Sequence, residues 1–180
     1  MHRLQGPRGA ALTRRPALLL VHIAALVVVL DQATKCAVVL YFAHRFPLRL
    51  LGGVLYLEEA RNPGAAFSIA GGSTVVFTVI AAVVTVAIVR VATRLRSLPW
   101  TVCLGLVLGG AIGNLVDRVV RSPAPFRGHV VDWIDLRVWP VFNLADSAIV
   151  IGGLLGVILS MRGVPIDRRS EADASPPLAP

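Results

Sequence analysis

Residues 73–89 of the chain are STVVFTVIAAVVTVAIV, and no charged side chain lies among them. Residues 98–113, LPWTVCLGLVLGGAIG, are also uncharged, and their apolar character continues to residue 120 around a few polar side chains. Two further apolar stretches cover residues 17–42, interrupted by a polar segment at 31–35, and residues 138–161, which contain one charge. A helix needs about 20 mostly apolar residues to cross the hydrocarbon core of a bilayer. The four stretches therefore predict an α-helical membrane protein with four transmembrane helices.

The composition excludes a soluble domain. Of the 180 residues, 56% are hydrophobic and 16% are charged, whereas soluble domains are about a quarter charged. A net charge of +8 would suggest a nucleic-acid partner for a soluble protein. Here it is typical of basic flanks that face anionic lipid, and because no nucleic-acid-binding motif occurs, no such partner is expected. Cys36 and Cys103 both lie in apolar stretches, which argues against a disulfide framework or a metal site.

The chain is expected to form one integral membrane domain, residues 1–180. It divides into a basic cytoplasmic arm at 1–15, a four-helix core at 16–161 and a cytoplasmic tail at 162–180 with a composition typical of disorder. No small-residue cleavage site follows the first apolar stretch, so we expect a retained helix rather than a removable signal peptide. Short basic flanks at both ends, and between the second and third stretches, place both termini in the cytoplasm.

The acidic residues gather on the opposite side of the membrane. When four helices alternate in direction, the polar ends of the first, third and fourth meet at one face. Seven of the ten acidic residues map there: Asp31, Glu58, Glu59, Asp117, Asp132, Asp135 and Asp146. This asymmetry predicts a site at or just below the outer interface of the cytoplasmic membrane.

An acid inside a membrane span costs about 2.5–3.5 kcal/mol, so each one needs an explanation. Asp31 has Lys35 one helical turn away, and Asp117 has Asn114 and Arg118 close by. Because each acid has an obvious partner, a structural polar clamp is the favoured interpretation for both.

Asp146 has the side chain of Asn143 near it but no cation, which favours a functional role. Asp132 lies in a short apolar segment that leads back to the membrane, and it is equally compatible with a loop cap and a catalytic group. Two carboxylates that share a desolvated site cannot both ionise easily, so the pair shares a proton and can activate a water. That is the chemistry of an aspartic protease, which needs no metal or cofactor.

Other chemistries have little support in the sequence. The four histidines show no metal-binding spacing, no serine lies in a Gly-x-Ser-x-Gly turn, and no glycine-rich phosphate loop occurs. The glycines at 109, 110, 113, 152, 153 and 156 are expected at close helix contacts rather than in a ligand site.

The segment 61–68 contains a turn at Asn62 and Gly64. Its small residues either leave room for a substrate backbone beside the Asn62 amide or simply re-enter the membrane.

Five segments of the chain together resemble the lipoprotein signal peptidases, the type II signal peptidases of bacteria. They are residues 31–35 (DQATK), 62–68 (NPGAAFS), 113–118 (GNLVDR), 130–133 (VVDW) and 142–147 (FNLADS). They occur in the order of the family, from the first helix to the fourth, and the resemblance covers about residues 16–161. The chain departs from the family pattern at Trp133, where phenylalanine is common.

The resemblance implies an aspartic endopeptidase of the cytoplasmic membrane that cuts diacylglyceryl-modified prolipoproteins just before the lipidated cysteine. It implies a catalytic dyad of Asp132 and Asp146. Residues that would bind substrate or support the dyad are Asp31, Lys35, Asn62, Gly64, Asn114, Asp117, Arg118 and Asn143. A small β-sheet in the outer loop between the first two helices is also implied, so short strands are expected within residues 48–67.

The resemblance implies no metal and no cofactor, and we expect a monomer whose partners are prolipoproteins and membrane lipid. Two other functions stay open. A small transporter or proton pathway also uses intramembrane acids, although here the acids gather at one face instead of forming a chain across the bilayer. A non-catalytic lipid-binding scaffold would not need two acids beside one pocket. Proton flux in liposomes would favour the transporter, and lipid binding that survives loss of both acids would favour the scaffold.

Overall fold

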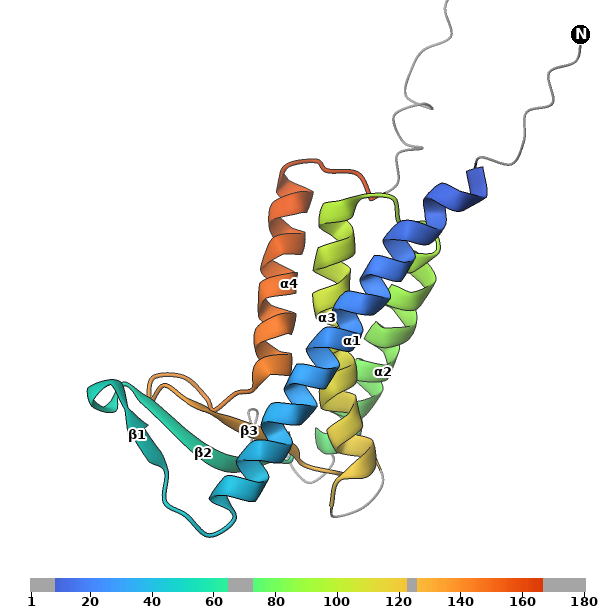
Figure 1. Ribbon diagram of the computed structural model, residues 1–180. Coiled ribbons are helices and arrows are strands. Elements are labelled where there is room, and N and C mark those ends of the chain that lie inside the picture. Colours follow the sequence, from blue (N-terminus) through green and yellow to red (C-terminus); the bar gives the residue numbers. More distant parts are fainter. Residues whose placement is uncertain (1–8, 65–72, 123–125, 167–180) are drawn as a thin grey trace, which may run out of the picture.

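The computed structural model describes residues 9–64, 73–122 and 126–166, with side chains from residue 15 onward (Figure 1). Its helices are α1 (Gly9–Phe42), α2 (Ser73–Ala92), α3 (Leu98–Val120) and α4 (Leu144–Met161). Its strands are β1 (Leu48–Leu50), β2 (Leu55–Asn62) and β3 (Val130–Asp135), with a single 3-10 turn, η1 (Leu51–Gly53), after β1. The predicted fold class, four apolar helices with a small outer sheet, is confirmed. The predicted disorder of the tail falls largely on residues 167–180, which lie outside the described residues.

The four helices are long and apolar enough to cross a membrane. They run side by side, and α3 packs against each of the other three (Figure 1). Half of the most apolar window of α3 is buried, whereas the buried share of the other three windows is 11–22%. The exposed side chains on the outer helices include Val21, Val83 and Leu154. Helix α3 is therefore the centre of the bundle, and apolar faces of the others are available to lipid.

Glycines allow α3 to approach its neighbours closely. A Cβ added at Gly109 would lie 2.6 Å from the Cβ of Val27 on α1. A Cβ added at Gly110 would clash with the backbone carbonyl oxygen of Ala145 on α4, and one at Gly152 would clash with α3. The predicted role at helix contacts is confirmed for these three glycines, but it is wrong for Gly153, where an added Cβ would meet no atom within 4 Å.

The strands form one antiparallel sheet in the order β1-β2-β3, beyond one end of the helices (Figure 1). Strands β1 and β2 lie within the predicted segment 48–67. Strand β3 is a difference from the sequence analysis, in which residues 130–135 are only an apolar segment leading back to the membrane. In β3, Asp132 pairs with Ala60 and Val130 pairs with Asn62. This pairing joins the loop after α1 to the loop before α4, and it fixes where Asp132 lies.

Helix α4 begins at Leu144, whereas the predicted apolar stretch begins at residue 138. A capping box explains the difference. The Asn143 side chain accepts a hydrogen bond from the Asp146 backbone N–H at 2.9 Å, and the Asp146 side chain accepts one from the Asn143 backbone N–H at 3.2 Å. The preceding Phe142 forms an isolated antiparallel bridge with Ile134. The apolar run thus continues outside the helix, as an extended segment beside the sheet.

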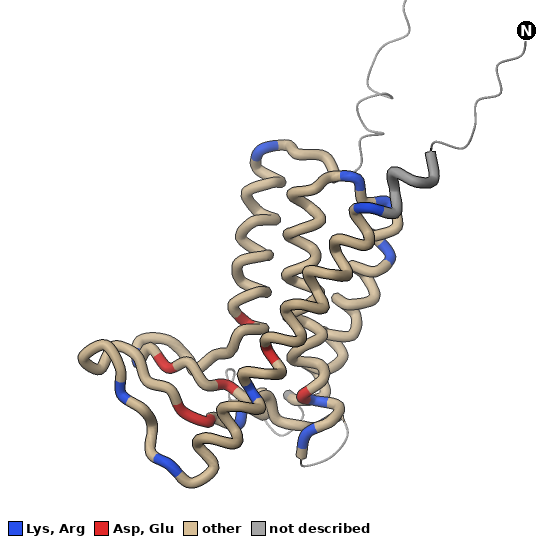
Figure 2. The backbone as a smooth tube through the Cα atoms, in the orientation of Figure 1, with Lys and Arg blue, Asp and Glu red and all other residues tan. Residues whose placement is uncertain are grey.

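The described acidic residues gather at the end of the bundle that carries the sheet, as Figure 2 shows. Basic residues are found at both ends. The predicted convergence of the acids of α1, α3 and α4 is thereby confirmed within the described part of the chain.

Candidate active site

Two acids from different elements form the centre of the candidate site. Asp132 lies in β3 and is 2% exposed, and Asp146 lies in the first turn of α4. The two carboxylates are close enough to interact electrostatically. Burial raises the pKa of Asp132 to about 6, and the neighbouring charge of Asp146 acts in the same direction. The loop-cap interpretation of Asp132 does not fit its place inside a strand.

Amide groups hold both oxygens of Asp132. Its Oδ1 accepts a hydrogen bond from Asn143 Nδ2 at 2.6 Å, and its Oδ2 accepts one from Asn62 Nδ2 at 2.9 Å. Hydrogen bonds to an ionised carboxylate favour the charged form, so both amides counteract the effect of burial on the pKa of Asp132. The amides therefore fix the orientation of the carboxyl group, while its pKa stays at about 6.

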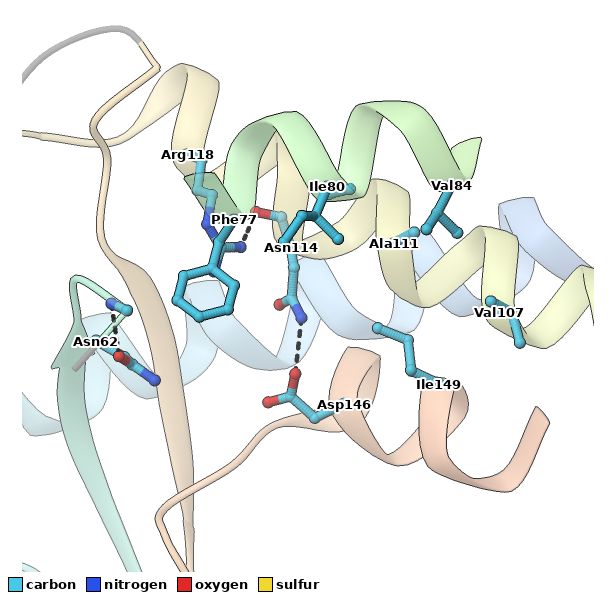
Figure 3. A pocket seen from close by; sticks show the side chains of 12 residues that line it. Asn62, Phe77, Ile80, Val84, Val107, Ala111, Asn114, Arg118, Asp146 and Ile149 are labelled. Carbon is cyan, nitrogen blue, oxygen red and sulfur yellow. Dashed lines mark hydrogen bonds between the residues drawn. The ribbon is translucent and has the colours of Figure 1, made fainter. Parts of the chain in front are cut away.

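Asp146 is held in the same way. Its Oδ1 accepts a hydrogen bond from Asn114 Nδ2 at 2.7 Å (Figure 3), and its Oδ2 accepts one from the backbone N–H of Asn143. No cation forms an ion pair with it among the described residues, in keeping with the sequence analysis, although Arg118 lies near enough for a Coulombic attraction. Its position at the N-terminus of α4 also favours a negative charge.

The side-chain amides of Asn62 and Asn143 point their NH2 groups at the dyad, because the oxygen of each amide accepts a hydrogen bond from a backbone N–H. Gly64 N–H donates to Asn62 Oδ1 at 2.8 Å, and Asp146 N–H donates to Asn143 Oδ1 at 2.9 Å. Gly64 has φ of 101°, a conformation that favours glycine. The turn predicted at Asn62 and Gly64 therefore orients one of the dyad amides. Residues 65–68 of the same motif lie outside the described residues.

A polar cluster of Asp31, Gln32, Lys35, Asp117 and Arg121 lies beside the dyad. Lys35 Nζ is 2.8 Å from Asp31 Oδ2 and 2.8 Å from Asp117 Oδ2, and all three side chains are fully buried. Arg121 Nε is 2.7 Å from Asp117 Oδ1, and Gln32 Nε2 donates to both acids. The predicted pairing of Asp31 with Lys35 is confirmed.

The predicted partners of Asp117 are wrong, since its ion pairs are with Lys35 and Arg121 instead of Arg118 or Asn114. The side chain of Arg118 turns toward Asn114, whose backbone carbonyl accepts from Arg118 Nη1 at 3.0 Å. Sequence reasoning missed Arg121, although its i,i+4 spacing from Asp117 is the same signal that identifies Lys35 beside Asp31.

The polar cluster also positions the backbone next to each dyad acid. Asp117 Oδ2 accepts the N–H of Val131 at 3.2 Å, and Asp31 Oδ1 accepts the N–H of Ala145 at 3.0 Å. Val131 and Ala145 are the residues immediately before Asp132 and Asp146. The buried acids of α1 and α3 therefore hold β3 and α4 where the dyad acids can meet.

A cavity of about 370 Å³ opens beside Asp146. Its polar lining comes from Asn62, Asn114, Asp146 and Arg118, whose guanidinium lies 5.8 Å from the centre of the Phe77 ring. Its apolar lining comes from α2, α3 and α4, and Figure 3 labels Phe77, Ile80, Val84, Val107, Ala111 and Ile149. Ala81 of α2 is also part of this lining. Asp132 is not among the described lining residues, but Asn62, which lines the cavity, donates a hydrogen bond to it.

A second cavity, of about 380 Å³, also includes Asp146 in its lining. It is lined by Leu136, Trp139, Phe142, Asp146, Ser147, Val150 and Ile151. Neither cavity includes Asp31, Lys35 or Asp117 in its described lining. The site residues implied by the sequence thus fall into two sets. One set lines a cavity: Asn62, Gly64, Asn114, Arg118 and Asp146. The other is outside the described lining of both cavities: Asp31, Lys35, Asp117, Asp132 and Asn143.

Comparisons with known proteins agree with these observations. Residues 23–162 match the family model described as Signal peptidase (SPase) II. The chain is 49% identical over 154 residues to the lipoprotein signal peptidase of Streptomyces griseus subsp. griseus, which covers 86% of this chain and 79% of that protein. It is 45% identical over 168 residues to the lipoprotein signal peptidase of Mycobacterium leprae, which covers 91% of this chain and 84% of that protein.

Two solved structures, each described as a bacterial membrane enzyme, have the same fold. The first has a TM-score of 0.69 and 31% identity, over 79% of this chain and 92% of that chain. The second has a TM-score of 0.67 and 27% identity, over 89% of this chain and 94% of that chain.

Proposed function

Since this chain belongs to the signal peptidase II family, we propose that it removes the signal peptide from diacylglyceryl-modified prolipoproteins by cutting just before the lipidated cysteine. Its four apolar helices and its similarity to bacterial membrane enzymes make it a multi-pass membrane protein. The observation that carries the proposal is a pair of acids, Asp132 and Asp146, held by amide N–H groups next to an apolar cavity.

The proposed mechanism is that of an aspartic endopeptidase. Asp132 and Asp146 share one proton, because two carboxylates in a desolvated site cannot both ionise easily. The ionised acid takes a proton from a water whose oxygen attacks the scissile carbonyl carbon, while the protonated acid gives its proton to the carbonyl oxygen. When the tetrahedral intermediate collapses, the C–N bond breaks and a proton passes to the leaving amine. The pKa of Asp132, raised to about 6, supports a proton that the pair retains in mildly acidic solution, about two pH units above the ordinary range of a carboxyl group.

The residues around the dyad then have positioning roles. Asn62, Asn114 and Asn143 hold the carboxyl groups through their amides, and Gly64 holds Asn62. Arg118 faces the cavity and has a Coulombic attraction to both acids. We assign Asp31 and Asp117 to the support of the backbone on either side of the dyad.

The cavity suits a substrate that arrives from the bilayer. Its walls are apolar side chains of three membrane-spanning helices, and its polar end includes Asp146 and Asn62, whose amide holds Asp132. Acyl chains gain about 0.8 kcal/mol for each buried CH₂, so the diacylglyceryl group would supply binding energy that does not depend on the peptide sequence. A monomer contains both acids and the whole described cavity, so no second copy is needed for this chemistry.

We place both termini in the cytoplasm and the dyad near the outer face, in a single domain with an arm at 1–15, a core at 16–161 and a tail at 162–180. The basic flank of Arg90, Arg94 and Arg96 lies at the end of the bundle away from the sheet and supports this orientation. The orientation is tested with a membrane-impermeant thiol reagent in intact cells that produce the protein without Cys36. Labelling of Arg49→Cys but not of Arg94→Cys is expected, and the reverse would invert the orientation.

The competing functions have less support. A proton pathway would need titratable groups through the depth of the bundle, whereas the described acids gather at the sheet end. A lipid-binding scaffold would use the apolar cavity but gives no reason for two acids with oriented amides beside it.

The decisive experiment is cleavage of a diacylglyceryl-modified prolipoprotein by the purified protein in detergent, compared with Asp132→Asn and Asp146→Asn. Asp135→Asn is the matched control, because Asp135 lies on the same strand but pairs with Arg137, outside the dyad. Loss of cleavage in both dyad variants, with the control active, is expected. Cleavage that survives either change would refute the dyad. A folded wild type that does not cleave would refute the proposed function, and proton flux in liposomes would then be measured.

A further inference from the structure

The ammonium group of Lys35 has three N–H donors, and three acceptors surround it. They are Asp31 Oδ2 and Asp117 Oδ2, each at 2.8 Å, and Asn114 Oδ1 at 3.1 Å. Lys35 is fully buried and lies outside the described linings of both cavities. Its third contact is therefore not needed to neutralise the two acids, and it leads directly toward the dyad.

That contact determines which way the Asn114 amide faces. An ammonium group can only donate, so the amide atom that meets Lys35 must be the oxygen. The NH2 group of Asn114 must then point the opposite way, and its Nδ2 donates to Asp146 Oδ1 at 2.7 Å. Asn143 Nδ2 also donates to Asn114 Oδ1, at 3.3 Å, and agrees with the same orientation. Lys35, Asn114 and Asp146 thus form a chain in which every donor and acceptor is assigned by chemistry.

We propose that Lys35 is a positioning residue that acts on the dyad through Asn114, by holding the amide so that its NH2 group faces Asp146. This inference rests on the proposed function. Asn62 and Asn143 receive the same orientation from backbone N–H groups, which are fixed by the fold. Asn114 depends on side chains instead, and without Lys35 only the longer bond from Asn143 Nδ2, at 3.3 Å, keeps its oxygen turned away from Asp146. A carboxylate facing that oxygen loses a hydrogen bond and gains a repulsion.

The alternative is that Lys35 only balances the charges of Asp31 and Asp117. The two roles differ in what they predict for combinations of variants. If Lys35 acts through Asn114, its loss has no further effect once the Asn114 amide has been removed. If it acts only on the fold, the two losses are independent and multiply.

The test is a double-mutant cycle of Lys35→Met and Asn114→Ala, with kcat and KM measured on a diacylglyceryl-modified prolipoprotein. Lys35→Met is expected to lower kcat about tenfold to a hundredfold, the range for hydrogen bonds that involve a charged group, with KM nearly unchanged. The double variant is expected to have the kcat of Asn114→Ala alone. Arg121→Gln is the matched control, because it removes the other cation on Asp117 without touching Asn114. Its kcat is expected to fall much less than that of Lys35→Met.

Lys35→Met leaves two buried acids short of a partner, so its folding has to be secured. The pair Asp31→Asn with Lys35→Met removes one charge of each sign and retains an oxygen for the N–H of Ala145. The same cycle with this pair must give the same result. Losses that multiply, a Lys35 variant with the kcat of the wild type, or an equal loss in Arg121→Gln would each overturn the inference while wild-type cleavage upholds the proposed function. A folded wild type that does not cleave would remove both.

Discussion

The capping of α4 by Asn143 can be separated from the bonds of its NH2 group, and substituting Asn143 tests whether the site works as described. Its oxygen caps α4 by accepting the Asp146 N–H at 2.9 Å, while its Nδ2 donates to Asp132 Oδ1 at 2.6 Å. Asn143→Ser retains a capping oxygen but is too short to reach Asp132. Asn143→Ala removes both interactions. The two variants should therefore differ in stability and agree in activity.

The magnitudes follow from the two kinds of interaction. Serine and asparagine are about equal as N-caps, and their replacement by alanine costs about 1 kcal/mol. Asn143→Ala is thus expected to be about 1 kcal/mol less stable than Asn143→Ser. A hydrogen bond to a charged group contributes about 1.5–3 kcal/mol, so both variants are expected to lose about 10-fold to 150-fold in kcat/KM.

The pH dependence gives a second readout of the same change. The side-chain NH2 group of Asn143 favours the ionised form of Asp132. Its loss therefore raises the pKa of Asp132 above the value of about 6. The limb of the kcat/KM profile that reflects Asp132 should move to higher pH in both variants. Thermal unfolding in detergent and prolipoprotein cleavage across pH are the two assays. Activities that follow stability, with alanine far below serine, would refute the separation of capping from dyad support.

Three further results are expected. The wild-type profile of kcat/KM should change near pH 6, where Asp132 titrates with its neighbour, and a profile flat from about pH 4 to 9 would contradict a shared proton. Gly64→Ala should lower cleavage severalfold, because φ of 101° strains any other residue by about 1–3 kcal/mol and loosens the Asn62 amide; a fully active variant would contradict this. Gly110→Ala should lower the free energy of unfolding by about 1–3 kcal/mol through its clash with α4, whereas Gly153→Ala, with open space around it, should not; equal stabilities would contradict the packing argument.

The helices and the convergence of the acids could be predicted from the sequence because both follow from simple rules. Four uncharged or nearly uncharged stretches of sufficient length give four spans, and alternation of direction brings Asp31, Asp117 and Asp146 to one end. Local spacing also predicts the ion pair of Asp31 with Lys35.

What could not be predicted depends on contacts between distant segments. Strand β3 is a short apolar run buried on both faces, which periodicity does not distinguish from a segment entering the membrane, and its partner β2 lies far away in sequence. The start of α4 is set by the capping box of Asn143 and Asp146, while the apolar composition begins earlier. The orientation of the Asn114 amide comes from Lys35 on another helix, and no local pattern encodes it.

The central claim is that Asp132 and Asp146 act as one catalytic unit. Its most direct test is the initial cleavage rate of a diacylglyceryl-modified prolipoprotein by the wild type, Asp132→Asn, Asp146→Asn and the double variant under one condition. Residues that act as a unit give strongly non-additive losses, so both single variants and the double variant are expected to fall to the same background rate. A double variant that is slower than either single variant by the product of their separate losses, or a single variant that still cleaves at the wild-type rate, would contradict the claim.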